Sequence, residues 1–306
     1  MLDQVDLDLA IDKREYKQAV SQLQARLYDM EQAVLEARLP VLVIFEGWAG
    51  TQKVETISTF TRRLDPRGFR VYPITPPRTY ETHYPWLYRF WRMLPRQGQV
   101  AIFDRSWYRQ MISERTGDNL SLVEWLRRCE DVVSLERLLS DDGVLVLKFW
   151  LHISRKEQQH RFHKLLGDKL TAWQVTDDDR WQNKHYDEVA LVVEDLLART
   201  DTAFAPWRLV PANNKHYARI AVLKTILATL EARLGRTAIA LERSTEDESF
   251  DDSGGSFRRG KWSGAATAGL QLAGNGREHA IETPVTVVAP VVAGSPPGVL
   301  QRLDLS

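Results

Sequence analysis

The sequence contains a single cysteine, Cys129, so neither an internal disulfide nor a cysteine-based metal site can form within the chain. Lys and Arg together number 41, as do Asp and Glu, and the formal net charge is zero. This balance argues against a general affinity for nucleic acid or for membranes, so any polyanion must be bound by locally clustered cations. No apolar run approaches the roughly 20 residues that span a bilayer, and the first residues lack an apolar secretory core. We therefore expect a cytoplasmic protein that binds neither nucleic acid nor a membrane.

Three regions of different composition follow one another along the 306 residues. In residues 1–40, apolar positions spaced three and four apart predict a helix that ends before Pro40. The sequence leaves open whether this N-terminal helix packs on its own domain or on another subunit. Residues 235–306 are rich in Ser, Gly and acidic residues without periodicity, which predicts a disordered tail with one weak strand candidate at residues 285–294.

The middle region, residues 41–234, alternates between apolar runs and longer helical stretches. This alternation predicts an α/β, three-layer P-loop NTPase-like fold, with a mostly parallel five-stranded sheet covered by helices on both faces. Ligands then bind at the carboxyl ends of the strands. The predicted strands are VLVIFE (41–46), FRVYPI (69–74), QVAIFD (99–104), VLVLKFWLHI (144–153) and WRLVP (207–211). The predicted helices include residues 79–94, 122–139 and 187–200.

The first predicted strand leads into GWAGTQK (47–53), which has the spacing of a phosphate loop. In such loops glycines let the backbone curl around a phosphate and the lysine supplies a positive charge, at the N-terminus of a helix. Two positions depart from the motif, because Gln52 replaces the inner glycine and Val54 replaces the magnesium-binding Ser or Thr. The candidates for phosphate binding here are Gly47, Gly50, Thr51 and Lys53.

A second candidate segment, VAIFDRSWY (100–108), places Asp104 and Arg105 at the end of an apolar strand. A carboxylate in this position beside a phosphate loop is where P-loop folds hold Mg²⁺. The neighbouring arginine can clamp a phosphate through two hydrogen bonds. An ordinary strand end with a capping aspartate has the same sequence, so both interpretations stay open for this pair alone.

Several long segments in order resemble the polyphosphate kinase 2 family, over roughly residues 9–234. These segments are EGW…K (46–53), LDPRGFRVYPITPP (64–77), YPWLYRFWRMLPRQGQVAIFDRSWY (84–108), VLKFWLHISRKEQ (146–158) and TDTAFAPWRLVPANNKHYARIAVLKTI (200–226). The resemblance implies a phosphotransferase domain with a helical lid at about residues 165–187. It also implies an activity, the transfer of phosphate between inorganic polyphosphate and a nucleoside mono- or diphosphate, with Mg²⁺ as cofactor. The nucleotide partner is expected to be AMP, ADP or GDP/ATP. A homo-oligomer is expected on the same ground.

The resemblance assigns roles to individual residues. Lys53 matches the phosphate-loop lysine, and Asp104 matches the Walker B aspartate that serves magnesium. Arg105 and Arg115 match arginines that neutralise the phosphate chain. Arg89, Arg92 and Arg96, spaced three and four apart, are expected to share one face of a helix, as a basic surface that guides the polyanion. A solvated helix face is the competing interpretation for these three.

Other positions differ from the family pattern, and all of them handle phosphate. Ala49 stands where relatives have a loop aspartate, and LTAWQ (170–174) lacks the basic residues of the relatives' lid. These departures, with Gln52 and Val54, leave an alternative open: a catalytically impaired paralogue that binds polyphosphate or regulates an active subunit. A kinase that uses ATP on a small molecule is disfavoured, because the matching segments extend well beyond the loop. For a nucleotide base, Trp48 is the expected apolar wall.

Overall fold

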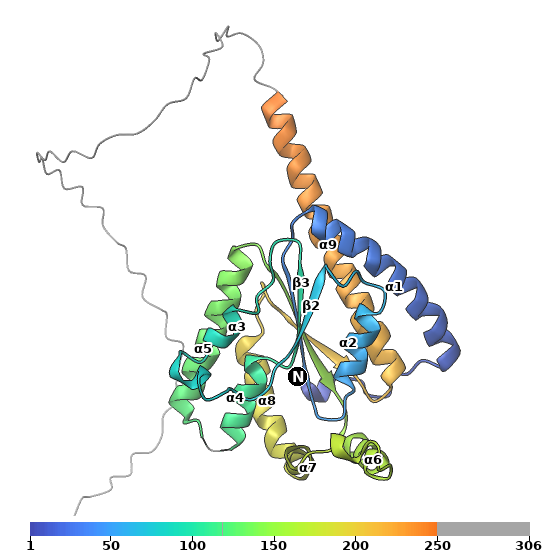
Figure 1. Ribbon diagram of the computed structural model, residues 1–306, viewed down its shortest axis with the longest axis vertical. Coiled ribbons are helices and arrows are strands. Elements are labelled where there is room, and N and C mark those ends of the chain that lie inside the picture. Colours follow the sequence, from blue (N-terminus) through green and yellow to red (C-terminus); the bar gives the residue numbers. More distant parts are fainter. Residues whose placement is uncertain (118, 250–306) are drawn as a thin grey trace, which may run out of the picture. The chain divides into compact units, whose positions relative to one another are not determined.

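Five parallel strands form the centre of the molecule, in the order β2-β3-β1-β4-β5. The computed structural model describes residues 1–117 and 119–249 (Figure 1). The apolar runs become strands where expected, and every residue of β1 except Gly47 is buried, as both faces of a parallel sheet are covered by helices. The strands are β1 (Val41–Gly47), β2 (Phe69–Pro73), β3 (Val100–Asp104), β4 (Leu145–His152) and β5 (Trp207–Pro211). The predicted α/β fold with a parallel five-stranded sheet is confirmed.

Helices cover both faces of this sheet, with α1, α2 and α9 on one side and α3, α4, α5 and α8 on the other (Figure 1). Helices α1, α4, α5, α6 and α7 begin at side-chain caps, such as the capping box between Ser121 and Glu124 in α5. The helices are α1 (Lys13–Glu36), α2 (Lys53–Thr61), α3 (Tyr88–Trp91), α4 (Trp107–Thr116), α5 (Leu122–Asp141), α6 (Arg155–Leu166), α7 (Asp177–Lys184), α8 (Tyr186–Thr200) and α9 (Lys215–Ser249). Short 3₁₀ turns lie at Leu2–Gln4, Glu81–His83 and Ala172–Gln174.

The N-terminal helix α1 packs along α9. Its residues Leu23, Leu27 and Val34 are buried in the same apolar core as the sheet. This contact answers the question that the sequence left open, since the helix lies on its own domain. Within residues 1–117 and 119–249, every helix is too short or too polar to span a bilayer.

Two predicted boundaries are wrong. The helix expected at residues 79–94 is reduced to a 3₁₀ turn and the four-residue α3, because Tyr84 must be extended (φ −113°, ψ 162°) before Pro85. Helix α9 continues past residue 234 to Ser249, so the first part of the predicted tail is helical. The remainder of that tail, with the strand candidate at 285–294, lies outside the described residues.

Candidate active site

The phosphate loop follows β1 directly and has backbone angles that favour glycine. Gly47 (φ 140°) lies so close to β4 that a Cβ would be 2.4 Å from the carbonyl oxygen of Leu151. Gly50 also has a positive φ, of 78°. Gln52 adopts the left-handed conformation (φ 60°, ψ 45°) at the position of the missing inner glycine. The loop therefore keeps a positive φ at position 52, although glutamine has a Cβ and glycine does not.

Helix α2 begins at Lys53 without a side-chain cap. The first backbone hydrogen bond of this helix is donated by the amide of Thr56 to the carbonyl of Gln52, at 3.1 Å. In the described part of the chain, the amides of Lys53 and Val54 donate to no acceptor. Such unpaired N–H groups and the helix dipole attract an anion.

The Lys53 ammonium is held inside the loop, 3.3 Å from the carbonyl oxygens of Gly47 and Trp48. Loss of hydration on burial, followed by the positive charge of Arg105, lowers the pKa of Lys53 to about 8. The hydroxyl of Thr51 donates to the Trp48 carbonyl at 2.8 Å and is buried. Thr51 thus stabilises the loop, and its hydroxyl hydrogen points to the backbone.

Asp104 and Arg105 lie at the carboxyl end of β3, which neighbours β1. The Asp104 carboxylate accepts no hydrogen bond from a described residue, and its charge acts on Lys53. Arg105 has a positive φ of 68°, and its amide donates to the Phe45 carbonyl at 2.9 Å. The predicted neighbours Lys53, Asp104 and Arg105 are therefore close together at one edge of the sheet.

Two residues that the sequence reasoning missed complete this site. Arg109, in the first turn of α4, has its pKa lowered by burial and by the charge of Arg105. Glu46 is buried, and accepts from the Ser106 hydroxyl at 2.7 Å and from the Arg109 amide at 3.2 Å. Burial raises the pKa of Glu46, against the charges of Lys53 and the arginines. The sequence signal for Arg109 is its place just after Arg105, in the segment that joins β3 to α4.

The other predicted arginines lie elsewhere. Arg115 lies near the end of α4, about 12 Å from the first residue of that helix, and it donates to the Leu120 carbonyl at 2.9 Å. Arg89 faces Glu81 (3.6 Å) and donates to the Thr75 carbonyl at 2.7 Å. Arg92 and Arg96 are exposed and lie beyond the end of α3. The expectation that residues 89, 92 and 96 share a helix face is therefore wrong, because the helix ends at Trp91. Phosphate binding by Arg89 and Arg92 stays a prediction.

Trp48 is fully buried and does not offer a surface to a nucleotide base. Its ring stacks on Tyr186 with centroids 4.0 Å apart, and its indole N–H donates to Nδ1 of His152 at 2.9 Å. Burial lowers the pKa of His152 to about 4, so this imidazole is neutral at neutral pH. The expectation for Trp48 is corrected: it anchors the loop to β4 and α8.

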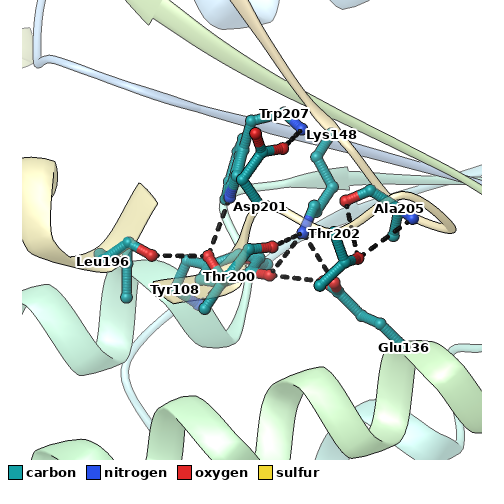
Figure 2. A network of polar contacts seen from close by, with 10 residues as sticks. Tyr108, Glu136, Lys148, Leu196, Thr200, Asp201, Thr202, Ala205 and Trp207 are labelled. Atoms are coloured by element: carbon teal, nitrogen blue, oxygen red, sulfur yellow. Dashed lines mark hydrogen bonds and ion pairs between the residues drawn. The ribbon is translucent and has the colours of Figure 1, made fainter. Parts of the chain in front are cut away.

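Behind the site, a buried polar network joins β4 to α4, α5 and α8 (Figure 2). Lys148 donates to a Glu136 carboxylate oxygen and to the Thr200 carbonyl, both at 2.7 Å, and to the Tyr108 hydroxyl at 3.1 Å. Tyr108 in turn donates to Glu136 at 2.5 Å. The network fixes α4, whose first turn carries Arg109.

Comparisons with known proteins agree with this geometry. The sequence profile of the family described as Polyphosphate kinase 2 (PPK2) matches residues 10–237. A polyphosphate:AMP phosphotransferase of Pseudomonas aeruginosa is 36% identical over 233 residues, which are 76% of this chain and 47% of the relative. A GDP-polyphosphate phosphotransferase of the same organism is 32% identical over 72% of this chain and 61% of the relative.

Among solved structures, polyphosphate kinase 2 from Arthrobacter aurescens TC1 superposes with a TM-score of 0.73 at 26% identity. The match covers 81% of this chain and 93% of that one. The chain spans about half the length of the first of these curated relatives.

Proposed function

The chain belongs to the polyphosphate kinase 2 family, and on that premise we propose that it transfers phosphate between inorganic polyphosphate and a nucleotide. The relatives' names specify AMP and GDP as nucleotides. These two and ADP are the substrates to test.

One observation carries the proposal. Lys53, Arg105 and Arg109 gather at the carboxyl edge of the sheet, where the positive charge of Arg105 adds to burial in lowering the pKa of both Lys53 and Arg109. Neither arginine's guanidinium donates to a described residue, and Lys53 is held only by two long contacts of 3.3 Å. Cations brought together and left without acceptors suit a chain of phosphates, which supplies both charge and oxygen atoms.

The proposed roles follow from position. The amides at the start of α2 and the ammonium of Lys53 bind the terminal phosphates. Arg105 and Arg109 offset the charge that spreads over the transferring group. No protein nucleophile is required, because in-line transfer between bound phosphates needs positioning and charge stabilisation.

A divalent cation fits this site as a partner of the phosphates. Among the described residues no group of three or more His, Cys, Asp or Glu side chains can hold a metal. Mg²⁺, however, is commonly bound by one or two carboxylates together with substrate phosphates. Asp104, with no hydrogen-bond donor on its carboxylate, is the residue that would hold Mg²⁺. The ion would supply further charge neutralisation at the transferring phosphate.

The test is an assay of purified protein with long-chain polyphosphate and Mg²⁺, with AMP, ADP and GDP as separate acceptors. We expect a nucleoside di- or triphosphate product, and its loss in Lys53→Met. Lys17→Met, which removes an exposed lysine on α1, is the matched control. Polyphosphate binding without any product would favour the impaired paralogue instead. Absence of both binding and product would overturn the proposal.

A further inference from the structure

The backbone of Ala49, in the middle of the phosphate loop, is held by side chains from helices α6 and α7. Its amide donates to Oε1 of Gln182 on α7 at 2.9 Å. Its carbonyl accepts from Nε2 of Gln158 on α6 at 3.1 Å. The amide and the carbonyl of Ala49 are thus both hydrogen-bonded to side chains of α6 and α7, not to neighbouring loop atoms.

The two glutamines form one buried network with a defined direction. Gln158 Nε2 also donates to Gln182 Oε1 at 3.1 Å, and Gln158 Oε1 accepts from Nδ2 of Asn183 at 2.9 Å. Both glutamines are buried, with exposed fractions of 0% for Gln158 and 6% for Gln182. A reversed Gln182 amide would set its NH₂ against two other donors, so the network requires its oxygen to face the loop.

Helix α6 also contacts the next loop residue, Gly50. Nη1 of Arg161 donates to the Gly50 carbonyl at 2.9 Å. A Cβ at Gly50 would lie 3.2 Å from the ring of Phe162. The loop therefore rests against α6, and Gln182 is the connection from α7.

We propose that Gln182 is a positioning residue that fixes the phosphate loop at Ala49 and couples helix α7 to phosphate binding. The inference rests on the proposed function, since it concerns the same site. Alanine at 49 offers no side-chain oxygen, so the loop conformation here depends on backbone contacts at that residue. With the Ala49 amide held by Gln182, the loop is preorganised, and less ordering is required when phosphate binds.

The first measurement is hydrogen exchange of the peptide that contains residues 47–52, followed by mass spectrometry. Gln182→Met has a similar length and no acceptor, so one additional amide should exchange early. Gln182→Glu keeps an acceptor oxygen and should restore the parent's protection. Gln159→Met makes the same chemical change on an exposed side chain of α6 and should exchange like the parent.

The second measurement is the affinity for tripolyphosphate by calorimetry. We expect binding by Gln182→Met to weaken by about fivefold, the equivalent of one lost hydrogen bond, while Gln159→Met binds like the parent. Should Gln182→Met not fold, Gln182→Ala tests the same contact with a shorter side chain. Unchanged exchange would show that the contact does not hold the loop, and unchanged affinity would show that it does not serve binding; either result overturns the inference. A parent that does not bind tripolyphosphate would defeat the proposed function and the coupling to binding, while the exchange comparison would still decide whether Gln182 fixes the loop.

Discussion

The ammonium of Lys148 lies 2.7 Å from a carboxylate oxygen of Glu136, and neither side chain is exposed to solvent. Burial alone would lower the pKa of Lys148 and raise that of Glu136, and each charge opposes the shift of the other. Removing one partner leaves an uncompensated charge in the core. We expect Lys148→Met to lower the free energy of unfolding by about 3–5 kcal/mol, measured by urea denaturation. The double variant Lys148→Met/Glu136→Gln should recover part of the loss. Equal loss in both variants would contradict this account.

The pKa of Lys53, about 8, predicts a pH dependence of phosphate binding. Lys53 is charged below this pH and loses its proton as the pH rises through it, so tripolyphosphate affinity should fall between pH 7 and 9. Lys53→Arg keeps its charge over this range and should show a flatter profile, even if its affinity is lower throughout. Calorimetry at pH 7, 8 and 9 makes the comparison. Parallel profiles for the two proteins would rule out titration of Lys53 as the cause.

Arg109→Gln should weaken tripolyphosphate binding by roughly tenfold or more, because a charge-assisted contact to phosphate is worth about 1.5–3 kcal/mol. Arg14→Gln is the matched control, since it removes the same charge from an exposed position on α1. The affinities are compared at low and at high salt. Equal losses in both variants would mean that only net charge matters.

Gln52 sits in a left-handed conformation that costs a residue with a Cβ about 1–2 kcal/mol. The variant Ala49→Asp/Gln52→Gly relieves this cost and restores the loop carboxylate of the relatives. We expect it to raise the rate of phosphate transfer from polyphosphate by up to about a hundredfold, and Lys53→Ala in the same background to abolish the gain. Val54 is left unchanged, because its side chain is 63% exposed on α2 and points away from the core. No gain in rate would identify the present loop as a working form.

His152 predicts a loss of stability in acid. Its pKa is about 4 in the folded chain because of burial, compared with about 6.5 for an unperturbed histidine. Between these values the unfolded chain takes up the proton and the folded chain does not, so stability falls as the pH drops from 6.5 to 4. The thermal midpoint of His152→Gln should therefore decrease less over this range than that of the parent. An identical pH slope would exclude His152 as the titrating group.

The sheet could be predicted from the sequence because strands buried on both faces must be continuous apolar runs, as in VLVIFE. The phosphate loop, Lys53 and Asp104 followed from a local motif at strand ends. The helix at 79–94 could not be inferred correctly from its apolar spacing, since the extended conformation before Pro85 overrides that spacing. Gln158 and Gln182 have no sequence pattern, because each contacts the loop from more than a hundred residues away.

The order of strands in the sheet has a consequence for synthesis of the chain. Strand β1, complete at residue 47, has β3 and β4 as its two neighbours among the described strands, and these end at residues 104 and 152. Its loop is shaped by contact with Leu151, whose carbonyl accepts from the Trp48 amide. During translation β1 must therefore wait about fifty further residues for its first partner, β3, and about a hundred for β4, long-range closures that slow folding. The segment that looks most like a phosphate-binding motif is made early, and it acquires its binding shape only after β4 has left the ribosome.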